Sequence, residues 1–199
     1  MRNISRGKAR VAFIAVVVVF SVALMGAAFA GSAAAQQTTT VNGTSGDTIQ
    51  DAVNNASDDE VIQITDDTYD ETVTFDSNLT NITIKAKDEA NPPKITGGIK
   101  IADDVSDLAI KNINLSGSAG AARTFNIGGG SVKNVTFDGV AFDGGNTQDV
   151  AIYGNAFEGD VTLNEVTVAD YTGDNWGIVY VSTNNGLEDV TLSGSTVQN

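Results

Sequence analysis

The chain has 199 residues, of which 25 are acidic and 11 are basic, and it contains neither cysteine nor histidine. The absence of cysteine excludes a disulfide framework and thiolate metal sites, and the absence of histidine excludes Ser-His-Asp triads, the common zinc sites and a histidine general base. This length is sufficient for one domain with a hydrophobic core and too short for two comfortable ones.

Residues 1–35 have the pattern of an export signal. Four basic residues precede an apolar run over residues 11–30, and the alanines at 33–35 offer a cleavage site before Gln36. Because the run is long enough to span a bilayer, an uncleaved membrane anchor is the alternative. Cleavage is favoured, since the run ends in small residues. The sequence therefore predicts a secreted or cell-surface protein with no membrane segment after cleavage.

Removal of residues 1–35 leaves a strongly acidic chain. The signal holds four of the 11 basic residues, so seven remain against 25 acidic residues, which is a net charge of −18. A chain of this charge repels nucleic acid and anionic lipid, so neither is an expected partner. The many aspartates, few lysines and lack of cysteine resemble the composition of exported proteins of halophilic archaea, where salt screens the self-repulsion.

The polar, threonine-rich residues 36–46 are predicted to form a flexible lead-in, and a short amphipathic helix is predicted over residues 47–56. The apolar residues of this helix recur at the spacing of one helix face, at Ile49, Ala52, Val53 and Ala56. Asp47 is the expected N-cap, with Gln50 three residues on in an arrangement close to a capping box. So short a helix is not stable alone, so its apolar face must pack on another element.

A sequence template repeats through the rest of the chain. It consists of Asp or Asn, an apolar residue, a small residue or Thr, an apolar residue, two turn residues and a second apolar–polar–apolar run. The copies are separated by 26, 27, 26 and 29 residues and begin at Asn81, Asp107, Asn134, Asp160 and Asp189. Further apolar pairs recur at similar intervals, at Ile99/Ile101, Phe125/Ile127, Val150/Ile152 and Val179/Val181. A repeat of this length is typical of a solenoid.

Equal periods allow like residues of successive coils to stack about 4.8 Å apart, whereas the Asn-Gly turns of a hairpin meander are mostly missing. We therefore predict an all-β protein, a parallel β-helix of about five coils over residues 47–199. The predicted helix would cap its open N-terminal end. Val135, Val161 and Val190 are expected to form one inward-facing column, and the threonines that follow them should face outward.

The last residues, 197–199, directly follow a repeat strand, and no capping segment comes after them. An open parallel edge invites pairing with other strands. The favoured prediction is that the β-helix is incomplete at its C-terminus and continues in a longer protein. The alternatives are that something covers the edge or that the open last coil self-associates.

Residues 48–98 contain the motifs TIQDAVNNA, VIQI, TYDETVTF, LTNITIKA and PPKITGG. This series resembles the start of pectin-lyase-like right-handed parallel β-helices, and the repeat pattern extends the resemblance through the remaining coils. The resemblance implies a right-handed coil. It leaves activity open, because that superfamily includes pectin methylesterases, polysaccharide lyases and non-enzymatic surface proteins.

The sequence motifs that resemblance would imply for catalysis do not occur here, so we assign no catalytic residue and no cofactor. Arg123 is the single arginine after residue 35 and lies in a loop of small residues. Asp138, Asp143 and Asp149 follow in later turns and would approach it in a groove if the coils stack. The alternative is a surface arginine with three turn aspartates, because Asp-Gly is common turn chemistry.

Two kinds of ligand site follow from residue types. Turn carboxylates offer oxygen ligands for calcium, at Asp66, Asp67, Asp103, Asp104, Asp138, Asp143, Asp170 and Asp174. Solvated acidic turns are the alternative, because none matches an EF-hand loop or a glycine–aspartate nonapeptide repeat. Trp176, with Tyr171 and Tyr180 nearby, is a candidate sugar-stacking platform, and aromatic packing of a loop on the coil is its alternative.

Acceptor triplets for N-glycosylation occur at six positions after the signal, at Asn42, Asn55, Asn78, Asn81, Asn114 and Asn134. Asn81, Asn114 and Asn134 lie within the repeat, where the template alone generates the triplet. We therefore expect modification first at Asn42 and Asn78, which fall in predicted loops.

Two functions from different classes follow. The favoured prediction is an exported, non-catalytic cell-surface or extracellular β-helix with a structural or carbohydrate-binding role, whose partners are polysaccharides or other cell-surface components. The alternative is a carbohydrate-active enzyme, lyase-like or esterase-like, that acts on an acidic polysaccharide. Electrostatics disfavours the alternative, because a chain of −18 repels a polyanion unless cations are bound.

Overall fold

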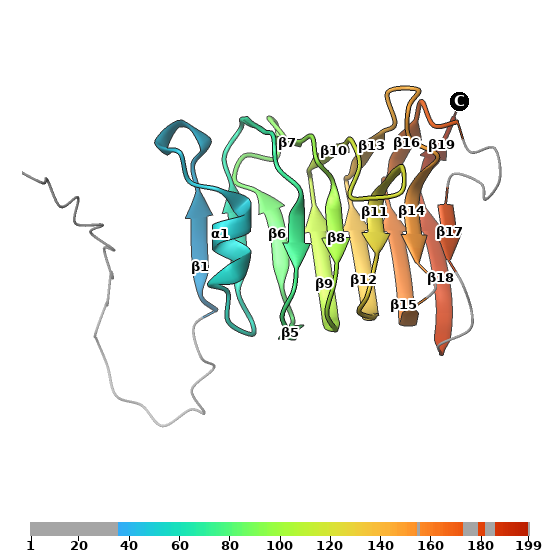
Figure 1. Cartoon of the computed structure of the whole chain (residues 1–199), viewed down its shortest axis with the longest axis horizontal. Coiled ribbons are helices and arrows are strands. Elements are labelled where there is room, and N and C mark those ends of the chain that lie inside the picture. The colour runs from blue at the N-terminus through green and yellow to red at the C-terminus, as the bar shows by residue number, and fades with distance from the viewer. Residues whose placement is uncertain (1–35, 155, 173–178, 182–185, 199) are drawn as a thin grey trace, which may run out of the picture. The chain divides into compact units, whose positions relative to one another are not determined.

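The computed structural model describes residues 36–154, 156–172, 179–181 and 186–198, and in this part the chain winds into a parallel β-helix of about six turns (Figure 1). The all-β fold is confirmed, with about one more turn than predicted. Three parallel sheets form its sides. Within the described part the first sheet contains β1 (Thr38–Val41), β2 (Val61–Ile64), β6 (Thr83–Ala86), β9 (Val105–Lys111), β12 (Val132–Asp138), β15 (Phe157–Asn164) and β18 (Leu187–Ser193), with β5 (Leu79–Thr80) beside β9.

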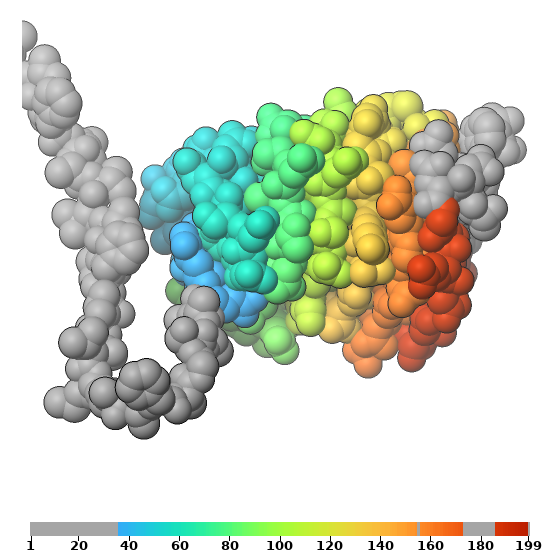
Figure 2. Space-filling view, turned by 90° about the horizontal axis from the view of Figure 1, so that it is seen from below, coloured from blue at the N-terminus to red at the C-terminus, as the bar shows by residue number. Residues whose placement is uncertain are grey.

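The other two sheets collect the remaining strands of each turn. The second sheet contains β3 (Thr68–Tyr69), β7 (Lys94–Ile95), β10 (Asn114–Ser116), β13 (Ala141–Asp143), β16 (Thr167–Ala169) and β19 (Thr196–Val197). The third sheet contains β4 (Val73–Phe75), β8 (Ile99–Ile101), β11 (Arg123–Ile127), β14 (Val150–Gly154) and β17 (Val179–Val181). Consecutive segments of the chain therefore form consecutive bands along the solenoid (Figure 2).

The strand register confirms the predicted inward column. Val135 pairs with Val161, and Val161 pairs with Val190. Val135 and Val161 are buried, whereas Val190, in the last described strand of the first sheet, is 39% exposed. The sequence period therefore equals one turn of the coil, because each inward side chain needs a neighbour of similar size above and below it.

In the first three copies of the template the first residue has a left-handed backbone, which explains its residue type, whereas in the fourth copy the preceding Gly159 takes this conformation. The φ angles of Asn81, Asp107 and Asn134 are 57°, 56° and 57°. Asn, Asp and Gly tolerate this conformation better than other residues. The side chains also bridge the turns, because Asn134 Nδ2 donates to Asp107 Oδ1 at 2.8 Å and Asn81 Nδ2 donates to Asp59 Oδ1 at 2.7 Å. In this repeat the Asp/Asn position therefore serves both the turn and the stacking.

A cluster of phenylalanines fills the middle of the core. The ring of Phe125 meets that of Phe137 edge-on at 5.1 Å between centroids and lies nearly parallel to that of Phe157 at 6.4 Å. Phe137 also contacts Phe142 at 5.5 Å. Since these rings come from all three sheets through β11, β12, β13 and β15, the cluster ties the sides of the solenoid together.

The predicted lead-in over residues 36–46 is wrong in part, because Thr38–Val41 forms β1. This strand pairs with β2 in the register Thr38–Val61. A 3₁₀ turn, η1 (Gly43–Ser45), follows it. The alternation that places Val41 in the core is masked in sequence by a run of polar threonines. A single buried residue in four was too weak a signal of a strand.

The predicted capping helix is confirmed, with a correction to its N-cap. The helix α1 (Ile49–Asn54) begins after Thr48, whose hydroxyl accepts from Asp51 N–H at 2.9 Å, so Thr48 and not Asp47 is the N-cap. The backbone N–H groups of Ile49 and Gln50, at the start of the helix, donate to the carboxylate of Glu71, each at 2.9 Å. A carboxylate at this end of a helix interacts favourably with the positive end of the helix dipole.

Helix α1 covers the exposed edge of the third sheet at β4. The apolar residues Ile49 and Val53 are buried against the first turn, as expected. The Gln50 side chain behaves as a peptide group of a missing strand: its Nε2 donates to Thr74 O at 2.9 Å, and its Oε1 accepts from Thr74 N at 2.6 Å. The backbone groups of the edge residue are therefore paired, which blocks this edge from pairing with another strand.

We expect Gln50→Ala to lower the free energy of unfolding by about 1–3 kcal/mol, because it leaves the N–H and C=O of Thr74 without their partner. Chemical denaturation at fixed salt measures this change. Gln37→Ala is the matched control, since Gln37 is exposed and only its backbone carbonyl forms a described hydrogen bond. Equal stability of both variants would contradict this role of Gln50.

Candidate functional site

The predicted groove residues occupy three sides of the solenoid. Arg123 begins β11 in the third sheet, and Asp149 lies directly before β14 in the next coil, where its N–H donates to Ala122 O at 2.8 Å. Asp138 ends β12 in the first sheet, and Asp143 ends β13 in the second. The structure therefore brings Arg123 and Asp149 to neighbouring coils and leaves Asp138 and Asp143 on other sheets.

Each of these aspartates is engaged in local structure. Asp138 Oδ1 accepts from Asn164 Nδ2 at 2.7 Å, and Asp149 Oδ1 accepts from Thr172 Oγ1 at 2.9 Å. Asp143 accepts from Gly145 N at 2.9 Å and lies 3.9 Å from Lys94 Nζ in an exposed ion pair. An exposed ion pair of this kind contributes little to stability. These carboxylates join turns and neighbouring coils.

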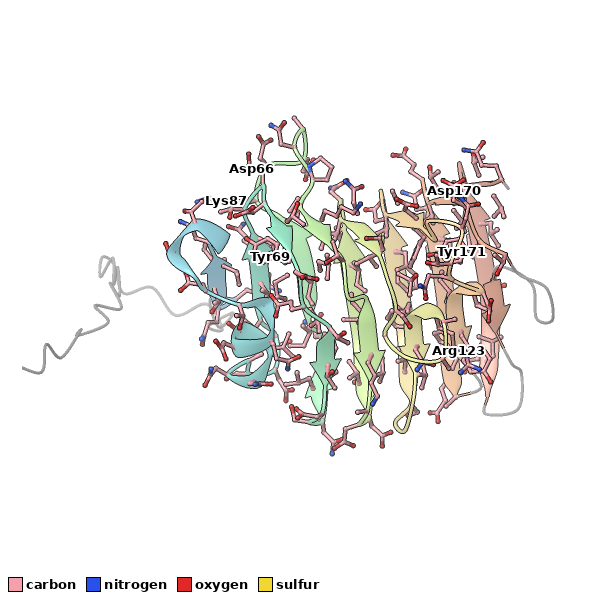
Figure 3. The ribbon with its side chains drawn as sticks, turned by 45° about the horizontal axis from the view of Figure 1, so that its top comes forward. Asp66, Tyr69, Lys87, Arg123, Asp170 and Tyr171 are labelled. Carbon is pink, nitrogen blue, oxygen red and sulfur yellow. The ribbon has the colours of Figure 1, made fainter. Side chains whose placement is uncertain are left out.

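Arg123 is held against the outer face of the third sheet. Its guanidinium carbon lies 3.2 Å from the centroid of the Tyr153 ring, and its Nη1 donates to Asn126 Oδ1 at 3.3 Å. Figure 3 shows Arg123 in the half of the solenoid that also holds Tyr171, away from Asp66 and Tyr69. The cation–π contact and the hydrogen bond hold the planar group in one orientation, which suits it for binding a ligand.

A pocket of about 460 Å³ opens beside this arginine, and we call it the Arg123 pocket. Its lining includes Arg123, Asn126, Tyr153, Ala156 and the glycines at 128–130. Asn126 is only 6% exposed, and its Nδ2 reaches Ala119 O at 3.4 Å. An amide, a guanidinium and an aromatic ring on a sheet are groups suited to binding a polar organic ligand.

The close approach of two coils requires a glycine at position 130 of the run 128–130. A Cβ on Gly130 would collide with the backbone carbonyl of Asp103 in the preceding turn. A Cβ on Gly128 would lie 3.1 Å from Lys100 Cε, so the lysine stem runs beside this glycine. The turn therefore exposes backbone instead of side chains at one wall of the pocket. In the sequence, this wall is visible only as a run of three glycines, which lies outside the repeat template.

The predicted aromatic platform needs a correction at Tyr171. This residue is 1% exposed, so its ring cannot stack on a sugar, and Trp176 and the side chain of Tyr180 lie outside the described residues. The Tyr171 hydroxyl shares a hydrogen bond of 2.7 Å with Thr124 Oγ1. Burial is the main influence and raises the pKa of Tyr171 well above its usual range. The hydrogen bond with Thr124 lowers this pKa, and the negative charge of Asp143 raises it further. Tyr171 is a neutral packing residue here.

The acidic turns proposed for calcium engage neighbouring backbone groups. Asp67 Oδ1 accepts from Thr68 N at 2.7 Å, and Asp103 Oδ1 accepts from Asp104 N at 2.8 Å. Asp104 Oδ1 accepts from Ser131 N at 2.9 Å. In the described ranges no three His, Cys, Asp or Glu side chains are grouped so as to hold a metal ion. Asp174 lies outside those ranges, and calcium binding remains a prediction from sequence alone.

The six glycosylation triplets differ in the state of their amide groups. Asn78 is exposed, and Asn42 Oδ1 accepts from Thr44 N at 3.2 Å, an arrangement that does not use its amide nitrogen. By contrast, the Nδ2 atoms of Asn81 and Asn134 donate to the aspartates of the preceding coil. Asn55 Nδ2 donates to Asp51 O at 2.7 Å. Asn114 lies in β10, between β7 and β13 of the second sheet.

We expect folded protein from a glycosylating host to carry glycans at Asn78 and Asn42 and none at Asn81 or Asn134. A glycan on Nδ2 adds bulk where two coils meet at Asn81 and Asn134, so a chain modified there does not complete the coil. Glycopeptide mass spectrometry of the folded fraction measures the occupancy, with Asn78→Gln as the control for peptide assignment. A substantial glycan population on Asn134 in folded protein would contradict this expectation.

Comparison with known proteins gives no relative: no family model, no curated protein and no solved structure matches the chain. Within the described residues, no helix has the length and hydrophobicity needed to cross a membrane.

Proposed function

We propose that this protein is an exported, non-catalytic β-helix that acts at the cell surface or outside the cell and binds carbohydrate through the Arg123 pocket. The observation that carries the proposal is the pocket itself, in which the guanidinium of Arg123, the amide of Asn126 and the ring of Tyr153 meet on the outer face of one sheet. Hydrogen-bonding side chains beside an aromatic ring are suited to a saccharide, which has hydroxyl groups and apolar C–H faces.

The family and the setting are part of the same proposal. The parallel β-helix supports a place in the pectin-lyase-like right-handed superfamily, on the motifs of residues 48–98. The basic and apolar pattern of residues 1–35 supports export with removal of the signal, although these residues lie outside the described part. The net charge of −18 after removal supports a high-salt environment, in which screening offsets self-repulsion.

A binding role is favoured over catalysis because the polar groups beside the pocket already bind one another. Arg123 is held by Asn126 and Tyr153, and the carboxylate of Asp149 accepts from Thr172. The second candidate is a carbohydrate-active enzyme, lyase-like or esterase-like. The position of Arg123 and Asp149 in neighbouring coils favours it, since a guanidinium can stabilise a developing negative charge and a carboxylate can accept a proton.

One experiment separates the two functions. Purified protein is incubated with a panel of polysaccharides, with and without calcium, and both retention on the polysaccharide and release of unsaturated product or acid are measured. We expect the protein to be retained on a polysaccharide without release of product. Tyr153→Leu should abolish this retention, whereas the control Thr162→Val, on the outer face of the first sheet, should leave the retention unchanged. Release of product that is lost in Asp149→Asn would support the enzyme instead. Full retention of Tyr153→Leu on the polysaccharide would show that the Arg123 pocket is not the binding site.

A further inference from the structure

A second groove, which we call the Asn78 groove, crosses the first sheet where its strands begin. Its volume is about 270 Å³, and it shares no lining residue with the Arg123 pocket. The lining comes from β5, at the lower edge of the solenoid in Figure 1, and from the starts of β9, β12 and β15. The groove therefore runs along the solenoid across successive coils.

One row of outward side chains forms the floor of this groove. Thr80 is the register neighbour of Ser106, Ser106 of Lys133, and Lys133 of Glu158. At about 4.8 Å between neighbouring strands, the row is about 14 Å long. Asn78 lines the same groove and lies directly before β5, at the N-terminal end of the row. A polymer that is attached to Asn78 and follows the row would cross four strands.

The amide of Asn78 is available for such an attachment. Asn78 begins the acceptor triplet Asn-Leu-Thr, its side chain is exposed, and in the described residues its amide nitrogen forms no hydrogen bond. The amide of Asn81 differs, because it donates to Asp59. In N-glycosylation the amide nitrogen loses a proton, bonds to C1 of the first sugar and displaces the phosphate group of a glycosyl donor, which the host supplies.

The groove offers hydrogen-bonding groups that suit sugar hydroxyls. Ser106 Oγ donates to Thr80 Oγ1 at 3.2 Å, and Ser131 Oγ donates to Asp104 Oδ1 at 3.0 Å. These bonds fix the groups in place, while the hydroxyl oxygens and the second carboxylate oxygen of Asp104 can each accept a further hydrogen bond. Lys133 forms no ion pair within the described part of the chain, so its amine can donate to a ligand.

The size of the groove favours a tethered sugar over a free one. Sites that bind free ligands usually have a volume of about 300–1,000 Å³, and this groove lies just below that range. A short tether raises the effective concentration of a ligand to the millimolar range, so a contact with a dissociation constant of about 1 mM is filled about half of the time. Weak contacts are therefore sufficient for a sugar chain that is attached beside the groove.

We propose that the Asn78 groove binds the protein's own N-linked glycan, which begins at Asn78 and lies over Thr80, Ser106 and Lys133. This inference rests on the proposed export, because only an exported chain meets the glycosylating enzymes, and it does not depend on the Arg123 pocket. In a solenoid each coil contacts only its neighbours. A glycan along the row would therefore link coils that do not otherwise touch.

The test compares two glycoforms of Asn42→Gln from a glycosylating host, one with the full glycan on Asn78 and one trimmed enzymatically to its first sugar. The substitution removes the other acceptor at which we expect a glycan. Peptide mass spectrometry measures how fast an amine-reactive ester acylates each lysine. We expect the full glycan to slow the acylation of Lys133 at least about twofold. Lys111, at the other end of β9, is the control and should react equally in both glycoforms.

A variant of the groove completes the test. In Ser106→Gln a longer side chain occupies the groove, so both glycoforms should acylate Lys133 at the same rate, and the unfolding midpoint checks that this variant retains the fold. Equal rates in the two glycoforms without this substitution would overturn the inference, because the glycan would then extend into solvent.

The glycan analysis separates this inference from the proposed export. In the unsubstituted folded protein, a glycan on Asn42 and none on Asn78 would overturn the inference and leave export intact. An intact mass that includes residues 1–35, with no glycan at either site, would overturn both. Retention on polysaccharide through the Arg123 pocket is measured separately and is unaffected by either result.

Discussion

Phe137→Ala is expected to lower the free energy of unfolding by about 3–5 kcal/mol. The Phe137 side chain is fully buried and contacts both Phe125 and Phe142. Its removal leaves a cavity between the three sheets, which the stacked coils on either side cannot fill. In a solenoid each turn is stabilised mainly by its neighbours, so the defect also weakens the coupling between the two halves. Denaturant titration followed by circular dichroism at fixed salt measures the loss.

Phe137→Leu is the matched control for this expectation. The register neighbours of Phe137 are Ile110 and Leu163, so the column already accepts aliphatic side chains at this level. We expect Phe137→Leu to cost clearly less than Phe137→Ala, because Leu fills part of the space that Ala leaves empty. A cost for Phe137→Ala below about 1 kcal/mol would mean that the phenylalanine cluster does not hold the sheets together.

The second large effect is expected at Gly117, directly after β10. Its φ is +72°, and an added Cβ would collide with the backbone carbonyl oxygen of Thr96 in the preceding coil. A backbone atom cannot move aside as a flexible side chain can. Gly117→Ala should therefore cost about 2–5 kcal/mol, from the left-handed backbone and from overpacking together. The change in the denaturation midpoint, with the slope checked for two-state behaviour, gives the value.

Gly46→Ala separates the two causes. Gly46 also has a positive φ, +79°, yet no heavy atom lies within 4 Å of the position that its Cβ would occupy. This variant should show the conformational cost alone, about 1–2 kcal/mol. If Gly46→Ala and Gly117→Ala cost the same, close packing between coils at Gly117 would not be the reason for its glycine.

The candidate site was only partly accessible from sequence. Arg123 could be singled out because it is the single arginine after residue 35, and its neighbour Asp149 followed from the repeat. Asn126 and Tyr153 could not be predicted as site residues, because no motif or spacing distinguishes them from other polar and aromatic residues in strands. Their proximity depends on the register between β11 and β14. Lys100 enters from the coil before, which no motif connects to Arg123.

The repeat of 26 to 29 residues was by itself enough to predict the parallel β-helix and the stacking of Val135 on Val161, and the apolar spacing of residues 47–56 predicted the helix at its open end. The physical reason is that burial of one apolar face in every turn requires the same residue types at equal intervals. Only the tertiary structure decided that Thr38–Val41 is a strand, that Gln50 pairs with the edge at Thr74, that Tyr171 is buried, and that Asn126 and Tyr153 line a pocket beside Arg123. These features depend on contacts between coils, and the polar side chains that make them follow no period along the chain.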